Sequence, residues 1–579
     1  GTYAVAAVLA VTLFYKTFPL IRSDNDDTLA RYAKSTVESL PKNGGILLND
    51  NETAAANPQI RALLIQAELA RTGRARDFLI VDTQLIDWAP YSHFLHEKAP
   101  DKWPAIPGDQ TMAKLKDFGV LSVLNHVAQS NTICYLNPSY GYFFEMFYQE
   151  PHGLVYRMKM LPADTLMPPP LSTNLVAENQ AFWKQVVDRE FPRVEKEASL
   201  PDPAKHMNPA RWLIMHLHGQ SSPNPNALLV ANLYSRSLDD WGVQLQRDGH
   251  LAAAAGCFAS AKKINPANVV AALNLDFNQK LQSGAPVTID PSSVSREQFG
   301  KYSDWNAVLN ANGPFDDPSF LFVNSALVAR SGLMRQTVAP FTRLRQLVPD
   351  FLPARLWLAQ IYLYNRQPDR ALDALQAPLD QPERFGLNET NSVAVNTLAA
   401  YAHLQKNDLS RGVELLNHEL AIHPADTNLL ASAAQAFFAR GLYTNALRVI
   451  DHALAQNPDS PQWLFGKGIA SLQMSNYDQA ISAMTHLLNV VTNDPNARFN
   501  RGVAYLQTDQ LDKARADLSE LQTTYTNSPQ IAFRLGEVAE KQHDTNEAIR
   551  NYEIFLANVP TNSPDIKTVN ERIARLQKK

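Results

Sequence analysis

The sequence predicts an α/β domain followed by a long all-α array of paired helices, so that the chain is mostly α-helical overall. Three observations lead to this fold class. Short apolar segments alternate with helical ones between residues 23 and 170, and a helical pattern then recurs from residue 235 onward. The length of 579 residues also exceeds what one hydrophobic core usually holds.

The composition is that of an ordinary folded protein, with 45% hydrophobic residues. A net charge of -4 over the whole chain provides no concentrated basic surface, and phosphate binding requires one. We therefore expect no nucleic-acid partner.

Residues 1–22 contain an apolar run from Ala4 to Tyr15 that is closed by Lys16. The run is too short to cross a bilayer alone, which takes about 20 residues. It also lacks the basic start and small-residue cleavage site of a signal peptide. The sequence thus predicts the end of a transmembrane helix that begins upstream, a membrane attachment through this segment, and an extracytoplasmic location for the residues after it. The alternative is a buried N-terminal helix of a soluble protein.

Residues 23–170 are predicted to form an α/β domain. The helical segments are Asp27–Leu40, Ile60–Arg71 and Met112–His126, and the strand-like segments are Ile46–Asp50, Asp77–Ile86, Asn131–Leu136 and Leu154–Met160. Helices between apolar strands favour at least partly parallel pairing.

Ligands of such sheets usually bind beyond the strand ends. This directs attention to the polar loop of Asp50, Asn51 and Glu52, which could bind a cation or a sugar. The alternative is an ordinary turn and helix cap. The sequence has no GxSxG, HExxH, P-loop or GxGxxG motif, so we predict no catalytic residue, no metal and no cofactor.

Residues 171–234 are predicted to be a helical adaptor, and residues 235–562 form the repeat array. Repeats start at Ser235, Pro318, Leu352, Val393, Thr427, Pro461, Pro495 and Pro529. The stretch 283–317 is an insertion within the array, and residues 563–579 are predicted to form an amphipathic capping helix of the kind that terminal repeats need.

At three positions of the repeat, which we call the eighth, twentieth and twenty-fourth places, one type of residue recurs. The eighth place is occupied by a small residue in most repeats: Gly242, Ala359, Ala400, Ala434, Gly468, Gly502 and Gly536. The twentieth place is small at Ala254, Ala371, Gly412, Ala446, Ala480, Ala514 and Ala548. The twenty-fourth place is large at Phe258, Phe341, Leu375, Leu416, Ile450, Met484, Leu518 and Tyr552. Small side chains let two antiparallel helices approach, and the large one fills the space beside them. The pattern resembles the tetratricopeptide repeat.

In this fold the first helix of each repeat lines the concave surface. The residues predicted at that surface are Phe438, Phe465, Leu472, Gln473, Phe499, Leu506, Gln507 and Phe533. An apolar wall with glutamines suits an extended, largely uncharged peptide. The alternative is that the phenylalanines only pack between adjacent repeats.

A further resemblance concerns residues 1–170. The stretches SLPKNGGILLNDNET, FLIVDTQLI and EPHGLVYRMKM resemble the soluble tail of a family of bacterial multi-pass membrane proteins, which are related to protein O-mannosyltransferases of the GT-C type. The resemblance implies sugar transfer by a membrane domain upstream, whose catalytic loop has no counterpart in this chain. It also implies a periplasmic location.

These observations lead to a functional hypothesis. The chain is a protein-interaction scaffold, the extracytoplasmic tail of a membrane-anchored and glycosyltransferase-like protein, which recruits protein or peptide partners. Two alternatives remain open: a structural subunit of a self-assembling envelope complex, as a homo- or hetero-oligomer, and a carbohydrate-active enzyme domain in residues 23–170.

Overall fold

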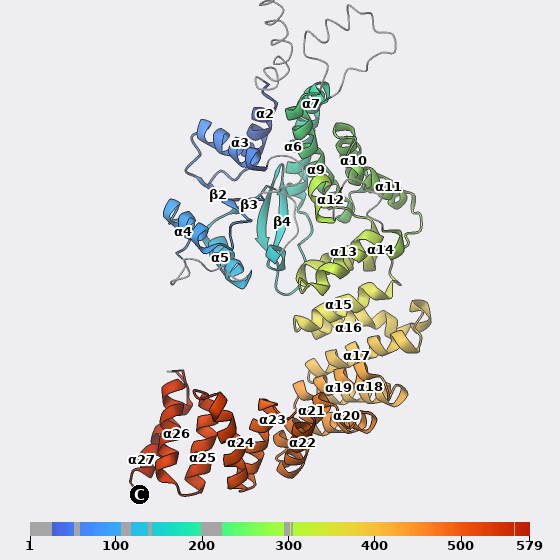
Figure 1. The fold of residues 1–579 in the computed structure, drawn as a ribbon. Coiled ribbons are helices and arrows are strands. Elements are labelled where there is room, and N and C mark those ends of the chain that lie inside the picture. Colours follow the sequence, from blue (N-terminus) through green and yellow to red (C-terminus); the bar gives the residue numbers. More distant parts are fainter. Residues whose placement is uncertain are drawn as a thin grey trace, which may run out of the picture. The chain divides into compact units, whose positions relative to one another are not determined.

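The computed structural model describes residues 26–50, 58–105, 117–136, 142–198, 223–294, 302, 305–560 and 562–578. The chain divides into a first unit, Gly1–Ile361, and a second unit, Tyr362–Lys579. The predicted fold class is confirmed: a small mixed sheet lies in the N-terminal region, and stacked helical hairpins make up the repeat array (Figure 1). The expected transmembrane segment, residues 1–22, lies outside the described residues. Within the described ranges, no helix combines the length and the apolar character that a membrane span requires.

The sheet of the first unit has five strands in the order β2-β1-β3-β5-β4. The strands are β1 (Gly45–Asn49), β2 (Phe78–Asp82), β3 (Ile133–Tyr135), β4 (Phe147–His152) and β5 (Val155–Met160). β1 pairs in parallel with β2 and β3, while β5 runs antiparallel to β3 and β4. Partly parallel pairing was the expectation, and β2 ends four residues earlier than its predicted segment because a turn follows Asp82.

Both faces of the sheet are covered, as the continuous apolar runs of its strands require. The helices of this region are α2 (Thr28–Glu38), α3 (Pro58–Arg71), α4 (Ala89–Lys98) and α5 (Asp117–Ser130). Leu47 packs with Val37 of α2 and Ile65 of α3. Its neighbours Ile46 and Leu48 belong to the opposite core with residues of α4 and α5. The side chains of β1 thus alternate between two cores.

Helices complete the first unit. They are α6 (Thr173–Arg189), α7 (Phe191–Ala198), α9 (Pro225–Arg247), α10 (Leu251–Ile264), α11 (Val269–Ser283), α12 (Trp305–Asn312), α13 (Pro318–Arg330) and α14 (Val338–Leu347), with the short η1 (Tyr142–Glu145), η2 (Pro291–Ser293) and η4 (Arg335–Thr337). The sequence-based boundary at residue 235 falls inside α9, because Asn224 caps that helix and Pro225 occupies its first turn. Cys134 and Cys257 are free thiols, and burial raises the pKa of each to about 12.

The second unit consists of helical hairpins that come after α15 (Leu352–Tyr364), a helix that spans the division. Their helices are α16 (Pro368–Asp380), α17 (Glu389–Gln405), α18 (Leu409–Ile422), α19 (Thr427–Ala439), α20 (Tyr443–Gln456), α21 (Pro461–Gln473), α22 (Tyr477–Val490), α23 (Pro495–Gln507), α24 (Leu511–Thr524), α25 (Pro529–Lys541) and α26 (Thr545–Asn558). The short η5 (Pro382–Phe385) lies between α16 and α17, and α27 (Asp565–Leu576) follows α26 as the last helix. The fifteenth place of each repeat takes a left-handed backbone conformation at Arg366, Asn407, Gly441, Ser475, Asp509 and His543. This conformation reverses the chain between the two helices of each hairpin.

The predicted packing between the eighth and twenty-fourth places is present. A Cβ atom built on Gly468 would lie 2.3 Å from Met484 Cε, and one on Gly536 would lie 2.5 Å from Tyr552 Cε1. In the α17–α18 hairpin, a Cβ atom on Gly412 would meet the carbonyl oxygen of Ala400 at 3.0 Å. The small residues therefore lie at the crossing points of paired helices, which is where the repeat register places them.

Candidate polypeptide-binding site

The first helices of successive repeats lie side by side. α17 contacts α19, α21 contacts α23, and α23 contacts α25. A recurring hydrogen bond links them: Gln405 Nε2 donates to the carbonyl oxygen of Leu363 at 3.1 Å, and Lys541 Nζ donates to that of Leu506 at 3.5 Å. In both cases the thirteenth place of one repeat binds the twelfth place of the preceding one. These bonds join α15 to α17 and α23 to α25.

The apolar residues predicted for the binding surface are largely engaged in packing. Phe438, Phe465, Phe499 and Phe533 are each half-buried and pack against the cores of their repeats. The ring of Phe533 lies 5.4 Å from that of Phe555. Leu472 is half-buried and Leu506 is 2% exposed. Each phenylalanine thus contributes to the core of the array and still leaves part of its side chain accessible.

The two glutamines are placed differently. Gln473 ends α21 and Gln507 ends α23, and both are exposed. Neither side-chain carboxamide makes a hydrogen bond to another residue of the described chain. Gln405 and Lys541 occupy the same place in other repeats and direct their donors to the preceding helix. Gln473 and Gln507 therefore present free carboxamides on the row of first helices.

Two arginines of α23 are paired with acidic residues of α24. Arg501 donates two hydrogen bonds to Asp517, at 2.7 and 2.8 Å, and Arg498 lies 2.7 Å from Glu520. The hydrogen bonds that Arg501 donates to Asp517 raise the pKa of Arg501, although burial opposes this. The charges of these two arginines are thus balanced by acidic residues of α24. Sequence analysis did not identify these pairs, although Arg498 and Arg501 are three residues apart on α23 and Asp517 and Glu520 are three residues apart on α24.

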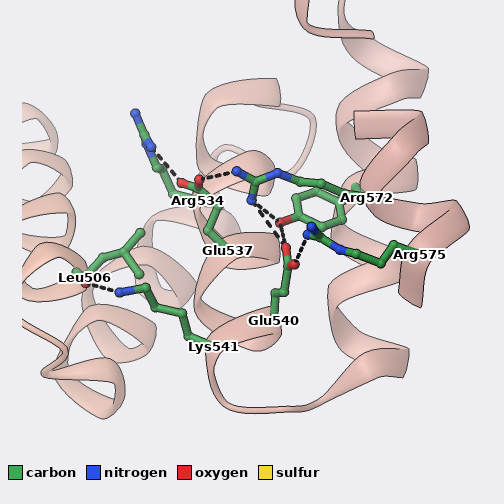
Figure 2. A network of polar contacts seen from close by, with 8 residues as sticks. Leu506, Arg534, Glu537, Glu540, Lys541, Arg572 and Arg575 are labelled. Atoms are coloured by element: carbon green, nitrogen blue, oxygen red, sulfur yellow. Dashed lines mark hydrogen bonds and ion pairs between the residues drawn. The ribbon is translucent and has the colours of Figure 1, made fainter. Parts of the chain in front are cut away.

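A network of ion pairs fastens α27 to the last hairpin (Figure 2). Arg572 lies 3.3 Å from both Glu537 and Glu540, and it donates to the Tyr552 hydroxyl at 3.0 Å. Arg575 lies 2.5 Å from Glu540. One turn before and one turn after Arg572, on the same side of the helix, Val569 and Leu576 are buried in the core of the last hairpin. α27 thus covers the apolar end of the array.

The pKa of Glu540 lies below its usual value. Burial raises this pKa, but the hydrogen bonds from Tyr552 and Arg575 and the charges of Arg572 and Arg575 together lower it by more than burial raises it. A depressed pKa stabilises the fold above the unfolded-state pKa of about 4.3, and this contribution disappears as the pH falls through the folded-state value.

We expect Glu540→Gln to lower the urea midpoint of unfolding at about pH 6 and to have a smaller effect at about pH 3, because wild-type Glu540 loses its charge as the pH falls through its lowered pKa. Urea titrations followed by circular dichroism at both pH values measure this. Glu553→Gln is the control, because Glu553 is exposed on α26. An equal loss at both pH values would show that the carboxylate charge of Glu540 does not hold α27.

The predicted polar loop is only partly within the described chain. Asp50 comes directly after β1, and its Oδ1 accepts hydrogen bonds from the hydroxyls of Thr83 and Tyr135. Asn51 and Glu52 lie outside the described residues. The contacts of Asp50 fasten the ends of β2 and β3 to the end of β1. Among the described residues, no group of three or more His, Cys, Asp or Glu side chains is arranged to hold a metal ion.

Comparisons with known proteins agree with the geometry of the array. The family model of the tetratricopeptide repeat matches residues 431–485 and 471–529. No curated protein sequence matches this chain.

Similar solved structures include a tetratricopeptide repeat protein from Parabacteroides merdae (15% identity, TM-score 0.32, covering 45% of this chain and 99% of that one). Another is the C-terminal part of a repeat-containing protein from Cytophaga hutchinsonii (15%, TM-score 0.36, 42% and 98%). A third is PilW, a type IV pilus biogenesis factor (15%, TM-score 0.28, 32% and 86%). Residues 431–529, which include α21 and α23 with their free glutamines, are thus tetratricopeptide repeats.

Proposed function

We propose that the second unit is a scaffold that binds an extended, largely uncharged polypeptide along the first helices α19, α21, α23 and α25. The observation that carries this proposal is the pair of exposed carboxamides, Gln473 and Gln507, which lack partners in the described chain. A carboxamide both donates and accepts hydrogen bonds, as a peptide group does. The partly exposed side chains of Phe465 and Phe499 supply apolar contact on the same helices, α21 and α23.

The pairing of the charges on the α23–α24 hairpin favours an uncharged partner. Arg498 and Arg501 are already neutralised by acidic residues of α24. An acidic peptide would have to compete with these carboxylates for the arginines, and a basic peptide would have to displace the arginines from them. A neutral backbone incurs neither cost.

Selection from a peptide-display library on the purified full chain tests this proposal. We expect uncharged, apolar peptides to be enriched and to bind about tenfold more weakly to the Gln473→Arg/Gln507→Arg variant, a loss of about 1.4 kcal/mol. The control is Glu553→Arg, which changes an exposed residue of α26. Unchanged binding of every selected peptide to the double variant would refute the proposed surface.

We further propose that this scaffold is attached to a bacterial membrane on its extracytoplasmic side, as part of a larger glycosyltransferase-like protein. Support comes from the apolar run Ala4–Tyr15 and from the resemblance of residues 1–170. In cells that express the complete gene, the repeats should sediment with membranes and be cleaved by protease added to spheroplasts. Recovery in the soluble fraction would contradict this proposal.

A further inference from the structure

The insertion 283–317 ends in a segment that lies on the first repeat as a bound peptide would. Residues 313–317 of this segment have no regular secondary structure. The segment is bound by side chains of α9, the first helix of that repeat, and of α11, which occupies the place of the next first helix and contacts α9. The chain thus contains an example of how two neighbouring first helices hold an irregular stretch of polypeptide.

The two ends of this segment are held at opposite ends of the repeat's first helix. Asn268 Nδ2 donates to the carbonyl oxygen of Asn312 at 2.9 Å and to the hydroxyl of Ser235, which begins the repeat, at 3.0 Å. The fully buried Asp316 accepts a hydrogen bond at 2.6 Å from Nε of Arg247, the thirteenth residue of the repeat. The stretch from Asn312 to Asp316 therefore lies lengthwise on α9.

Between these ends, a carboxamide binds the main chain of the segment. Asn274 Nδ2 donates to the carbonyl oxygen of Pro314 at 2.9 Å, and Asn274 Oδ1 accepts the N–H group of Asp316 at 3.0 Å. The same Nδ2 donates to both carboxylate oxygens of the buried Asp239, at the fifth place of the repeat. A Cβ atom on Gly313 would lie 2.9 Å from Asp239 Oδ2. The segment thus covers the fifth and thirteenth places of α9.

In the second unit, α21 and α23 carry exposed carboxamides at both ends of the corresponding face. Gln473 and Gln507 hold the thirteenth place, and Gln462 and Asn496 hold the second. The side chains of Gln462 and Asn496 also make no hydrogen bond to another residue of the described chain. The second and thirteenth places lie about three helical turns apart, so they share one side of the helix at a separation of about 16 Å.

The surface between these two pairs of carboxamides is apolar. Four half-buried side chains hold the fifth and ninth places: Phe465, Ile469, Phe499 and Val503. α21 and α23 contact each other, so the side chains of both helices contribute to one surface. The neighbouring first helices lack a free carboxamide at the thirteenth place. α19 ends in Ala439, and Lys541 of α25 is bound to Leu506 and Asp509.

We propose, on the basis of the function proposed above, that α21 and α23 together bind an extended segment of about five residues that lies lengthwise on them, with one pair of carboxamides at each of its ends. An extended chain advances about 3.3 Å per residue, so about five residues span the distance between the pairs. A carboxamide donates and accepts, and it binds the main chain as Asn274 binds Pro314 and Asp316. Because glutamine replaces Arg247 at the thirteenth place, the partner needs no carboxylate.

A segment that crosses the two helices would meet the carboxamides in a different combination. It would reach Gln473 near one of its ends and Gln507 near the other, and it would leave Gln462 and Asn496 without contact. A lengthwise segment instead meets Gln473 and Gln507 at the same end. The direction of the bound chain therefore decides which carboxamides act together.

The test uses the peptides enriched by the display selection, synthesised with capped termini and shortened from either end. Calorimetry measures their binding to the purified full chain. We expect the Gln462→Arg/Asn496→Arg variant and the Gln473→Arg/Gln507→Arg variant each to bind the unshortened peptides about tenfold more weakly, since each loses two carboxamides. Shortening the peptide at one end should abolish the effect of one variant and leave the effect of the other unchanged.

The control is Asn489→Arg/Thr524→Arg, which adds the same two charges at exposed positions of the second helices α22 and α24 and should bind like wild type. All three variants should keep the wild-type urea midpoint, because the substituted side chains are exposed. The inference is overturned if Gln462→Arg/Asn496→Arg binds like wild type, or if shortening one end abolishes the effect of Gln473→Arg but not that of Gln507→Arg. Failure to enrich any peptide would refute the proposed function and this inference with it.

Discussion

Replacing Asp316 by asparagine is expected to lower the free energy of unfolding of the first unit by about 3 kcal/mol. The substitution keeps the shape of the side chain but removes the negative charge that Arg247 and Arg343 share. Breaking a buried ion pair leaves the remaining charge uncompensated, which typically costs about 3–5 kcal/mol. The lower end applies here because the Arg247 side chain is 38% exposed and can reach water.

Urea unfolding followed by tryptophan fluorescence measures this change, because all tryptophans except Trp463 lie before residue 362. The matched control is Asp276→Asn on α11, where the carboxylate lies 2.8 Å from Lys280 and both side chains are about 60% exposed. Exposed pairs contribute about 0–1 kcal/mol, so the control should shift the transition little. Equal effects of the two substitutions would show that Asp316 is not a buried charge centre.

The second large effect is expected for Gly536→Ala. The added methyl group would meet the ring of Tyr552 at 2.5–2.6 Å, and the ring cannot move aside easily because its hydroxyl is held by Glu540 at 2.8 Å and Arg572 at 3.0 Å. Overpacking of this kind typically costs about 1–3 kcal/mol. Alanine is about 1 kcal/mol more favourable than glycine in the interior of a helix. A net loss of stability on Gly536→Ala would therefore come from the steric clash alone.

Gly466→Ala serves as the matched control for Gly536→Ala. It makes the same change within a first helix, but its nearest neighbour is the terminal Cδ1 atom of the flexible Ile450 side chain at 3.3 Å. We expect Gly466→Ala to be neutral or stabilising in urea titrations followed by circular dichroism. If Gly536→Ala were also neutral, α25 and α26 could not approach each other closely at Gly536 and Tyr552.

The repeat register could be predicted because its cause is local and recurs. The small eighth and twentieth places and the large twenty-fourth place lie within one hairpin, and each repeat supplies an independent instance of the pattern. The turns between paired helices follow the same register, since Asn407, Asp509 and their equivalents take a left-handed conformation at one position of the repeat. The alternation of Ile46, Leu47 and Leu48 between two cores also follows from strand geometry alone.

The contacts of Asp316 in the first unit could not be predicted in this way. Asp316 lies in the sequence insertion 283–317, and its partners Gln246 and Arg343 come from α9 and α14. No periodicity relates these positions, so only the fold brings them together. For the binding surface, the pattern identified Gln473 and Gln507 but could not separate Leu506, which is buried, from residues that reach solvent.

A double-mutant cycle between Gly536 and Tyr552 tests the packing of the repeats most directly. Tyr552→Leu removes the ring that the new methyl group would strike, so Gly536→Ala should cost much less in the Tyr552→Leu background than in wild type. We predict an interaction free energy of about 1–2 kcal/mol from urea titrations of the four proteins, within the range for residues in contact. Additive losses, with no interaction free energy, would contradict the pairing of the eighth and twenty-fourth places on which the whole array depends.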